Sequence, residues 1–331
     1  MGGRPAGGEP RRILPAVRAD ELARLPLPAL RGAAVRVDQL LRRIVRASED
    51  EIAAIEAELV EALQDEWTGR MPGALDAAIA AIEKSIVAGT VTEVELAGIV
   101  EAIRTRMVAT DIAAAMDAAV GRAIGGAYGF GREGVLKPLH LAIDFNLVDE
   151  HAQKVLKNDT LFWVGGAWDR TLGGQIADVI RERVIEQGLG RKDAAAELER
   201  IFAKDFPDKS RAYWEIVASA GVVRARTFGA VESFVQAEVE TYRWLSVEDA
   251  RTCATCGYLD GRIFTVASAV RMRDTFLAAE DPEAAKAAHP WAQPKDVVGK
   301  TTAELVEADF SMPPIHGRCR CDLVVDRFQG E

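Results

Sequence analysis

Four cysteines and one histidine near the end of the chain have types and spacing that predict metal chemistry. Two cysteines form a C-x-x-C turn, and the sequence H-x-x-C-x-C follows about 60 residues later. The five candidate ligands are Cys253, Cys256, His316, Cys319 and Cys321. Thiolate and imidazole are ligands that zinc prefers, and two sulfurs three positions apart on a turn can bind one ion at about 2.3 Å. The spacing therefore predicts a metal site that joins the turn to the tail.

A structural zinc ion takes four ligands, so five candidates leave one over. We expect Cys253, Cys256 and His316 to bind, and the choice between Cys319 and Cys321 stays open. Two disulfides or four unliganded thiols are the alternatives. The chain starts without an apolar signal segment, which indicates a reducing cytoplasmic compartment and favours zinc over disulfides.

The ligand types favour a structural ion over a catalytic one. The chain contains neither the H-E-x-x-H sequence of metalloproteases nor the H-x-E…P-C-x-x-C sequence of deaminases. The sequence Gln236-Ala237-Glu238 matches the Q-x-E of ADP-ribosyltransferases, but three residues match often by chance. We therefore expect no enzymatic activity, and an ADP-ribosyltransferase-like enzyme or a zinc hydrolase is the rival class.

Other polar residues are expected to support the site or to lie outside it. Asp249 and Arg251 flank the C-x-x-C turn and are expected to pair locally or to orient the ligands, with a solvated pair as the alternative. His140 and His151 stand alone in the sequence, and a surface or hydrogen-bonded role is expected for both. His289 precedes Pro290-Trp291 and is expected to anchor a loop.

Composition and charge limit the classes of partner. The chain has 331 residues, of which 49% are apolar, and a formal net charge of -10, which disfavours nucleic acid as a partner of the whole molecule. Residues 1–47 differ, because ten arginines and four acids give them a charge of +6 and leave -16 for the remainder. Residues 1–47 are expected to contact an acidic protein surface or DNA phosphates. The alternative is a soluble surface that happens to use arginine. No apolar stretch is long enough to predict a membrane span.

The pattern of the N-terminal half predicts helices separated by short breaks. We expect a flexible basic arm at 1–15 and a helical bundle at 16–145. Capping boxes at Ser48-x-x-Glu51 and Thr92-x-x-Glu95 predict two helix starts. Met71-Pro72-Gly73 predicts a break, and the glycine-rich stretch 125–134 predicts a hinge between helices.

The C-terminal half mixes helices with short strands. The alternation at 239–247 predicts a strand, and Leu259-Asp260-Gly261 predicts a turn into a second strand at 262–264. Helices are expected at 150–157, 163–187, 191–202, 210–237 and 266–279, and a closing strand at 323–325. The predicted fold class is therefore mainly α, with an N-terminal helical bundle and a C-terminal α+β zinc-binding domain at 146–331.

The residues around the predicted ligands resemble a known family. Trp244, then D-x-R-T-C-x-x-C from Asp249, L-D-G from Leu259 and Phe264 precede P-P-x-H-x-x-C-R-C from Pro313. This order resembles the phage head morphogenesis family, the minor head proteins similar to the F protein of phage Mu. The resemblance covers about 150–325. It departs from the family at Phe228, where the A-R-T-E helix of such proteins carries a glutamate.

The resemblance implies a structural role in a virus particle. Proteins of this family are minor capsid components that are present in few copies, associate with the portal vertex and act in head assembly. The implied partners are the portal protein, the major capsid protein or both, and the implied locations are the virion and, during assembly, the host cytoplasm. A nucleic-acid-binding protein that uses the arginine-rich residues 1–47 is the second alternative, beside the enzyme.

Overall fold

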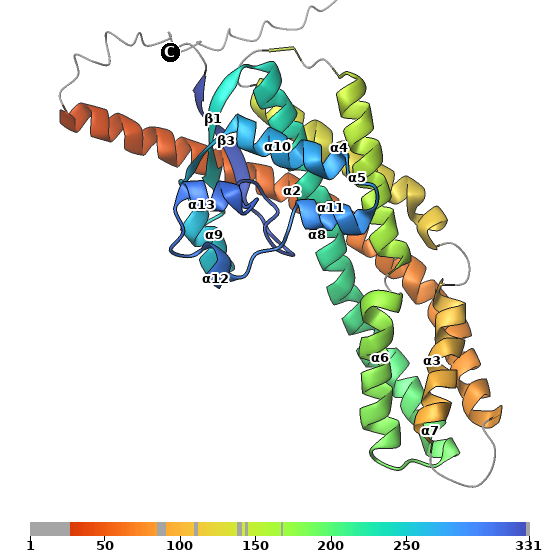
Figure 1. Ribbon diagram of the computed structural model, residues 1–331. Coiled ribbons are helices and arrows are strands. Elements are labelled where there is room, and N and C mark those ends of the chain that lie inside the picture. Colours follow the sequence, from red (N-terminus) through yellow and green to blue (C-terminus); the bar gives the residue numbers. More distant parts are fainter. Residues whose placement is uncertain are drawn as a thin grey trace, which may run out of the picture. The chain divides into compact units, whose positions relative to one another are not determined.

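A computed structural model describes residues 27–84, 91–108, 112–137, 141–142, 145–166 and 168–328. These residues are mainly helical and include one three-stranded antiparallel sheet (Figure 1), so the predicted mainly α fold class is confirmed. The contacts divide the chain into two compact units, 1–44 and 45–331, and every contact described below lies within the second. The predicted flexible arm at 1–15 lies outside the described residues.

The long helices come first along the chain and the sheet comes late. The helices are α2 (Leu27–Lys84), α3 (Glu93–Val108), α4 (Ile112–Leu136), α5 (Leu147–Gly165), α6 (Gly173–Ile180), α7 (Arg191–Arg200), α8 (Phe206–Gln236), α9 (Ala254–Leu259), α10 (Val266–Leu277), α11 (Pro282–Ala288), α12 (Pro294–Val297) and α13 (Thr302–Glu307). Three π-helical turns are η1 (Trp168–Leu172), η2 (Arg181–Ile185) and η3 (Ile201–Asp205). The strands β1 (Val239–Leu245), β2 (Ile263–Thr265) and β3 (Asp322–Phe328) pair in the order β2-β1-β3. Helices from both sides of residue 145 lie in the second unit, and the division into a bundle at 16–145 and a domain at 146–331 stays a prediction.

Helix α2 passes through two positions where the sequence predicts a start and a break. Ser48 is not an N-cap, and its hydroxyl donates instead to the Asp322 carboxylate at 3.2 Å. Pro72 lies inside the helix on its exposed side. A proline in a helix interior costs about 3 kcal/mol. Full burial of Trp67 and near-complete burial of Met71 contribute roughly 1.5–3 kcal/mol each and offset that cost.

Two other predicted helix ends are confirmed, and one predicted helix is interrupted. The backbone N–H of Thr92 donates to the Glu95 carboxylate at 2.7 Å, which is the capping box at the start of α3. The stretch predicted as one helix from 163 to 187 instead begins as the end of α5, which stops at Gly165, and resumes at η1. It ends at Gly188, whose φ of 63° is the left-handed conformation that glycine adopts at low cost.

The glycine-rich stretch 125–134 is part of α4 and not a hinge. A Cβ atom on Gly131 would lie 2.0 Å from the carbonyl oxygen of Arg226 in α8. Likewise, a Cβ atom on Gly229 in α8 would lie 2.2 Å from the carbonyl oxygen of Tyr128 in α4. These glycines therefore let the backbones of α4 and α8 touch, and this close packing keeps the stretch helical despite its low intrinsic propensity.

Buried polar residues fix α4, α5 and α8 to one another. The Arg132 guanidinium lies 3.2 Å from the Asp149 carboxylate, and neither side chain has solvent access. The Tyr128 hydroxyl donates to the same carboxylate at 2.9 Å. Arg132 also donates to the side-chain carbonyl oxygen of Gln236 at 2.8 Å. Gln236, the first residue of the Q-x-E sequence, thus has a structural role at the end of α8.

The sheet confirms the predicted strands after residue 238. Tyr242 of β1 pairs with Phe264 of β2, and their rings stack with centroids 6.0 Å apart. On the other side of β1, Leu245 pairs with Asp322. The end of β1 therefore lies beside the start of β3, although the two strands are far apart in the sequence.

Candidate metal centre

The register of the sheet brings the two ligand clusters to one edge. β1 ends at Leu245, whose strand partner Asp322 is the first residue of β3. The residue before Asp322 is Cys321. The loop that carries Cys253 therefore leaves the sheet beside the segment that carries Cys321. This pairing explains how ligands far apart in sequence meet.

The C-x-x-C turn opens a short helix. Cys253 is the N-cap of α9, and its sulfur accepts a hydrogen bond from the backbone N–H of Cys256 at 3.4 Å. Cys253 is exposed and Cys256 is buried. The turn thus presents one sulfur near the solvent and one sulfur toward the interior.

The His316 ring faces both sulfurs of this turn. Its Nε2 atom lies 3.2 Å from the Cys253 sulfur and 3.0 Å from the Cys256 sulfur. Its Nδ1 atom lies 2.7 Å from the carbonyl oxygen of Gly317, which can only accept a hydrogen bond. Nδ1 therefore carries a proton, and Nε2 faces the two sulfurs, which is the arrangement of a metal-ligating histidine.

Cys319 and Cys321 form a second group with Cys256. Both are buried, and none of the four cysteines forms a disulfide, so the disulfide alternative is not what the structure contains. Hydrogen bonds from the Cys256 and Cys321 thiols hold the pKa of Cys319 well below its usual range. A thiolate at Cys319 is thus stabilised by two neighbouring thiols, which are the atoms that a bound cation would draw together.

The donor set fits a thiophilic metal ion. The ligand atoms of Cys253, Cys256 and His316 lie within 4.8 Å of one another, and so do those of Cys256, Cys319 and Cys321. A tetrahedral ion with bonds of about 2.0–2.3 Å separates its ligands by roughly 3.3–3.8 Å, so small side-chain movements would complete a site. All five predicted residues are therefore together, in two groups that share Cys256 and could hold a metal.

An arginine between the last two cysteines holds the upstream loop. The Arg320 guanidinium donates to both oxygens of Asp249, at 2.8 and 2.6 Å, and lies 3.6 Å from the Glu49 carboxylate. The hydrogen bonds from Arg320 hold the pKa of Asp249 well below its usual range. The expected local contact of Asp249 with Arg251 is also present, at 3.5 Å. The sequence does not predict the bidentate contact with Arg320, because nothing in it links these two positions.

The D-x-R-T segment also shapes its own turn. The Asp249 side chain accepts a hydrogen bond from the backbone N–H of Arg251 at 2.8 Å. The Thr252 hydroxyl accepts one from the backbone N–H of Asp249 at 3.0 Å. These side chains stabilise the turn that delivers Cys253 to its position.

The L-D-G turn fixes the other end of the loop. The Asp260 carboxylate accepts hydrogen bonds from the backbone N–H and the hydroxyl of Ser246, at 2.7 and 3.1 Å. Gly261 has a φ of 75° and donates its N–H to the carbonyl oxygen of Trp244 at 2.8 Å. The predicted turn is confirmed, and it closes the loop that contains the C-x-x-C turn.

Helix α8 contacts the segment that carries the last cysteine. The buried Arg226 donates to the carbonyl oxygen of Cys321. Phe228, which stands where the resembled family has an acid, is buried with its ring edge-to-face against Phe276 at 5.4 Å. One turn further along α8, Glu232 pairs with Arg273 at 2.7 Å. Position 228 therefore contributes packing and no charge.

The two other histidines that the structure describes, His151 and His289, lie outside the ligand groups. His140 lies outside the described residues, and His151 is exposed on α5. His289 is buried, and its Nε2 atom lies 3.2 Å from the carbonyl oxygen of Met312, as expected of a loop anchor. Burial, with the charge of Arg224, lowers the pKa of His289 to about 3.

The region that carries this centre matches a known family. The family model described as phage Mu protein F like protein matches residues 175–324, which include all five candidate ligands. Residues 175–324 are similar to the phage Mu protein F-like family. This is a family of phage head morphogenesis proteins, so the predicted resemblance is confirmed. No curated protein and no solved structure matches the chain. Among the described residues, no helix is both long and apolar enough to cross a membrane.

Proposed function

We propose that this Mu F-like protein is a minor capsid protein that acts at the portal vertex during head assembly. Its partners would be the portal protein, the major capsid protein or both, first in the host cytoplasm and then in the virion. The observation that carries this proposal is the family match over residues 175–324, the region that contains the candidate metal centre. The enzymatic alternative gains no support from Gln236, because its side chain is bonded within the fold.

We also propose that the centre binds one structural zinc ion through Cys253, Cys256, His316 and one of the two tail cysteines. The fourth ligand would be Cys319 or Cys321, because the sulfurs of both lie within 4.8 Å of the Cys256 sulfur. The ion would close a loop of about 60 residues between Cys256 and His316, and zinc ligation contributes roughly 10–16 kcal/mol in small peptides.

Metal analysis of the purified protein tests the zinc proposal. We expect about one zinc per chain by plasma mass spectrometry, and loss of that zinc in Cys256→Ser and His316→Ala. His151→Ala is the matched control and should keep its zinc, because His151 is exposed and lies outside both ligand groups. Of Cys319→Ser and Cys321→Ser, the variant that loses zinc identifies the fourth ligand. Wild-type protein that folds without any metal would refute the site.

Co-expression with head proteins of the same phage tests the assembly role. We expect the chain to copurify with the portal protein, and the zinc-free His316→Ala variant to copurify less. Copurification with the major capsid protein alone would move the site of action away from the portal. Copurification with neither, by a folded zinc-loaded chain, would contradict the assembly role while leaving the metal centre intact.

A further inference from the structure

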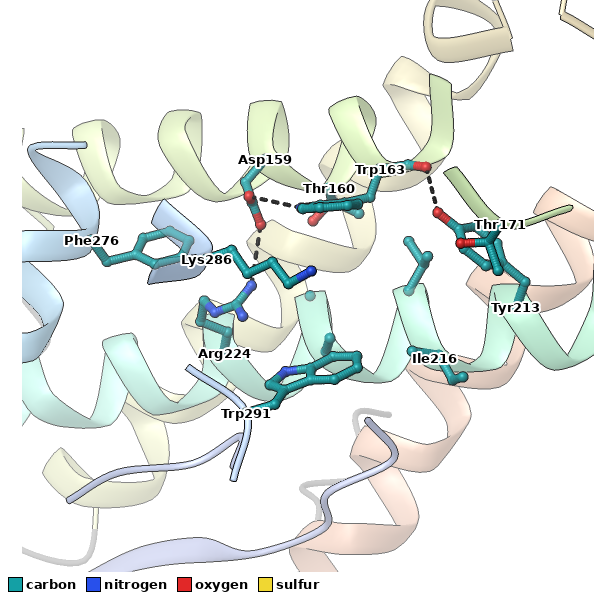
Figure 2. Close-up of a pocket in the computed structure, with 13 residues that line it drawn as sticks. Asp159, Thr160, Trp163, Thr171, Tyr213, Ile216, Arg224, Phe276, Lys286 and Trp291 are labelled. Carbon is teal, nitrogen blue, oxygen red and sulfur yellow. Dashed lines mark hydrogen bonds and ion pairs between the residues drawn. The ribbon is translucent and has the colours of Figure 1, made fainter. Parts of the chain in front are cut away.

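An aromatic pocket lies between α5, α8 and the segment that links the two ligand clusters. Its volume is about 260 Å³. Figure 2 shows Trp163 on α5 facing α8, and Lys286 extending between the two helices. Tyr213, Phe276 and Trp291 complete the aromatic part of the wall. Trp291 is 42% exposed, so part of this aromatic surface reaches the solvent.

The charged residues of the pocket leave an excess of positive charge. The Arg224 guanidinium and the Asp159 carboxylate lie 3.1 Å apart and are both buried, so they neutralise each other. Lys286 is exposed, and its Nζ atom lies 5.0 Å from the centre of the Trp163 ring. The buried Nε atom of Arg224 has no hydrogen-bond partner among the described residues. The pocket thus offers one cation at its rim, Lys286.

We propose that this pocket binds one large apolar side chain, aromatic or branched, from an acidic segment of a partner protein. A volume of about 260 Å³ is below the roughly 300–1,000 Å³ of small-molecule sites and suits a single side chain. The aromatic walls would pack against that side chain. Lys286 would pair with a carboxylate that flanks the bound side chain.

The acidic charge expected of the occupant excludes the chain's own residues 1–47. Residues 1–47 carry a charge of +6, which the Lys286 rim would repel. A second copy of the chain is the other acidic candidate, because the remaining residues carry -16. The inference depends on the chemistry of the pocket and holds whether or not the protein acts in head assembly.

Calorimetric titration of the full chain with unlabelled peptides tests the proposal. The probe is acetyl-Asp-Glu-Asp-Phe-Asp-Glu-amide, and its two controls replace Phe by Ala or every acid by Lys. We expect the acidic Phe peptide to bind at least about tenfold tighter than the Ala peptide, because a buried Phe side chain leaves water. We expect the basic Phe peptide to bind at least about tenfold more weakly than the acidic one at low salt.

Two variants locate the binding in the pocket. Ala220 is a half-buried wall residue of α8, so Ala220→Phe fills the cavity. This variant should bind the acidic Phe peptide at least about tenfold more weakly. Lys286→Glu reverses the charge of an exposed side chain at the rim and should weaken binding of the acidic Phe peptide about fivefold. Lys192→Glu is the matched control on α7, which does not line the pocket, and should change nothing.

Three results would overturn the proposal. The first is equal binding of the Phe and Ala peptides, and the second is binding unchanged in Ala220→Phe and Lys286→Glu when thermal melts show both variants folded. The third is a wild-type dimer in sedimentation equilibrium that Ala220→Phe dissociates, because the occupant would then be a second copy.

Discussion

Arg320 occupies the position between the two tail cysteines and binds the loop that delivers the C-x-x-C turn. Its guanidinium contacts both oxygens of Asp249, so one side chain connects the two ligand clusters without binding the metal. A bidentate contact fixes orientation as well as distance. The arginine therefore limits how far the tail sulfurs can move relative to those of the turn.

We predict that Asp249→Asn weakens zinc binding by up to about fivefold. The variant loses the carboxylate that orients Arg320 between Cys319 and Cys321, and a partly exposed ion pair contributes at most about 1 kcal/mol. Competition with a colorimetric zinc chelator at pH 7 measures the affinity. Asp309→Asn is the matched control. Asp309 pairs with Arg271 at 3.0 Å, and neither residue belongs to a ligand group. Equal affinities for all three proteins would contradict this role of Arg320.

We predict that His289 makes the fold sensitive to mild acid. Its pKa is about 3 in the folded chain, because of burial and the charge of Arg224, and about 6.5 when unfolded. Between these pH values the unfolded chain binds a proton that the folded chain does not, so stability falls as the pH decreases from 6.5. The loss should be about 2 kcal/mol at pH 5.

Urea unfolding at pH 7 and pH 5 measures this dependence. His289→Gln should show a smaller loss between the two pH values, even if it is less stable overall. His151→Gln should behave as the wild type, because His151 is exposed on α5. The same loss in His289→Gln and the wild type would assign the acid sensitivity to other groups.

The five candidate ligands were predictable from the sequence, whereas the pairing of Arg320 with Asp249 was not. Metal chemistry restricts ligands to a few residue types, so their spacing is informative on its own. A carboxylate can pair with any arginine that the fold brings near. Both residues belong to visible motifs, but their contact depends on the register of β1 and β3, which spacing along the chain does not reveal.

The crossing of α4 and α8 shows, at the scale of elements, why some local sequence signals failed. Five glycines between 125 and 134 predict a hinge from propensity alone. The contacts that override propensity join positions about 100 residues apart, as between Gly131 and Arg226. The break predicted at Pro72 in α2 is wrong for a similar reason, because burial of neighbouring residues is not visible locally. The strands at 239–247 and 323–325 and the capping box at Thr92 were predictable, because alternation and capping are local.

We predict that Gly131→Ala destabilises the protein by about 2–3 kcal/mol. The new methyl group would meet the Arg226 carbonyl at 2.0 Å, and backbone cannot yield as a flexible side chain does. Gly129→Ala, on the same helix with nothing within 4 Å, should instead stabilise by up to about 1 kcal/mol. Urea denaturation of both variants checks this pair. Similar stabilities for the two would show that the helices can separate at little cost.

Charge is divided unevenly over the whole molecule, and the arginine-rich arm sets the remaining prediction. We expect the full chain to bind duplex DNA weakly at low salt, and a chain lacking residues 1–47 to lose that binding. Fluorescence anisotropy across a salt series measures the slope of affinity against salt. Replacing the ten arginines of the arm by lysine is the control, because it keeps the charge of +6 and should keep the slope. Binding that survives deletion of the arm would assign the contact elsewhere.

Cys253 is the exposed member of a cluster whose other sulfurs are buried. An ion held there would have one face open to water, so chelators and competing thiols would approach from that face. Exchange of the ion should therefore begin by release of Cys253, and a bulky alkylating reagent should react with this thiol before the other three. The lifetime of the bound metal would then depend on the one surface sulfur, whereas its affinity would depend on the buried ligands.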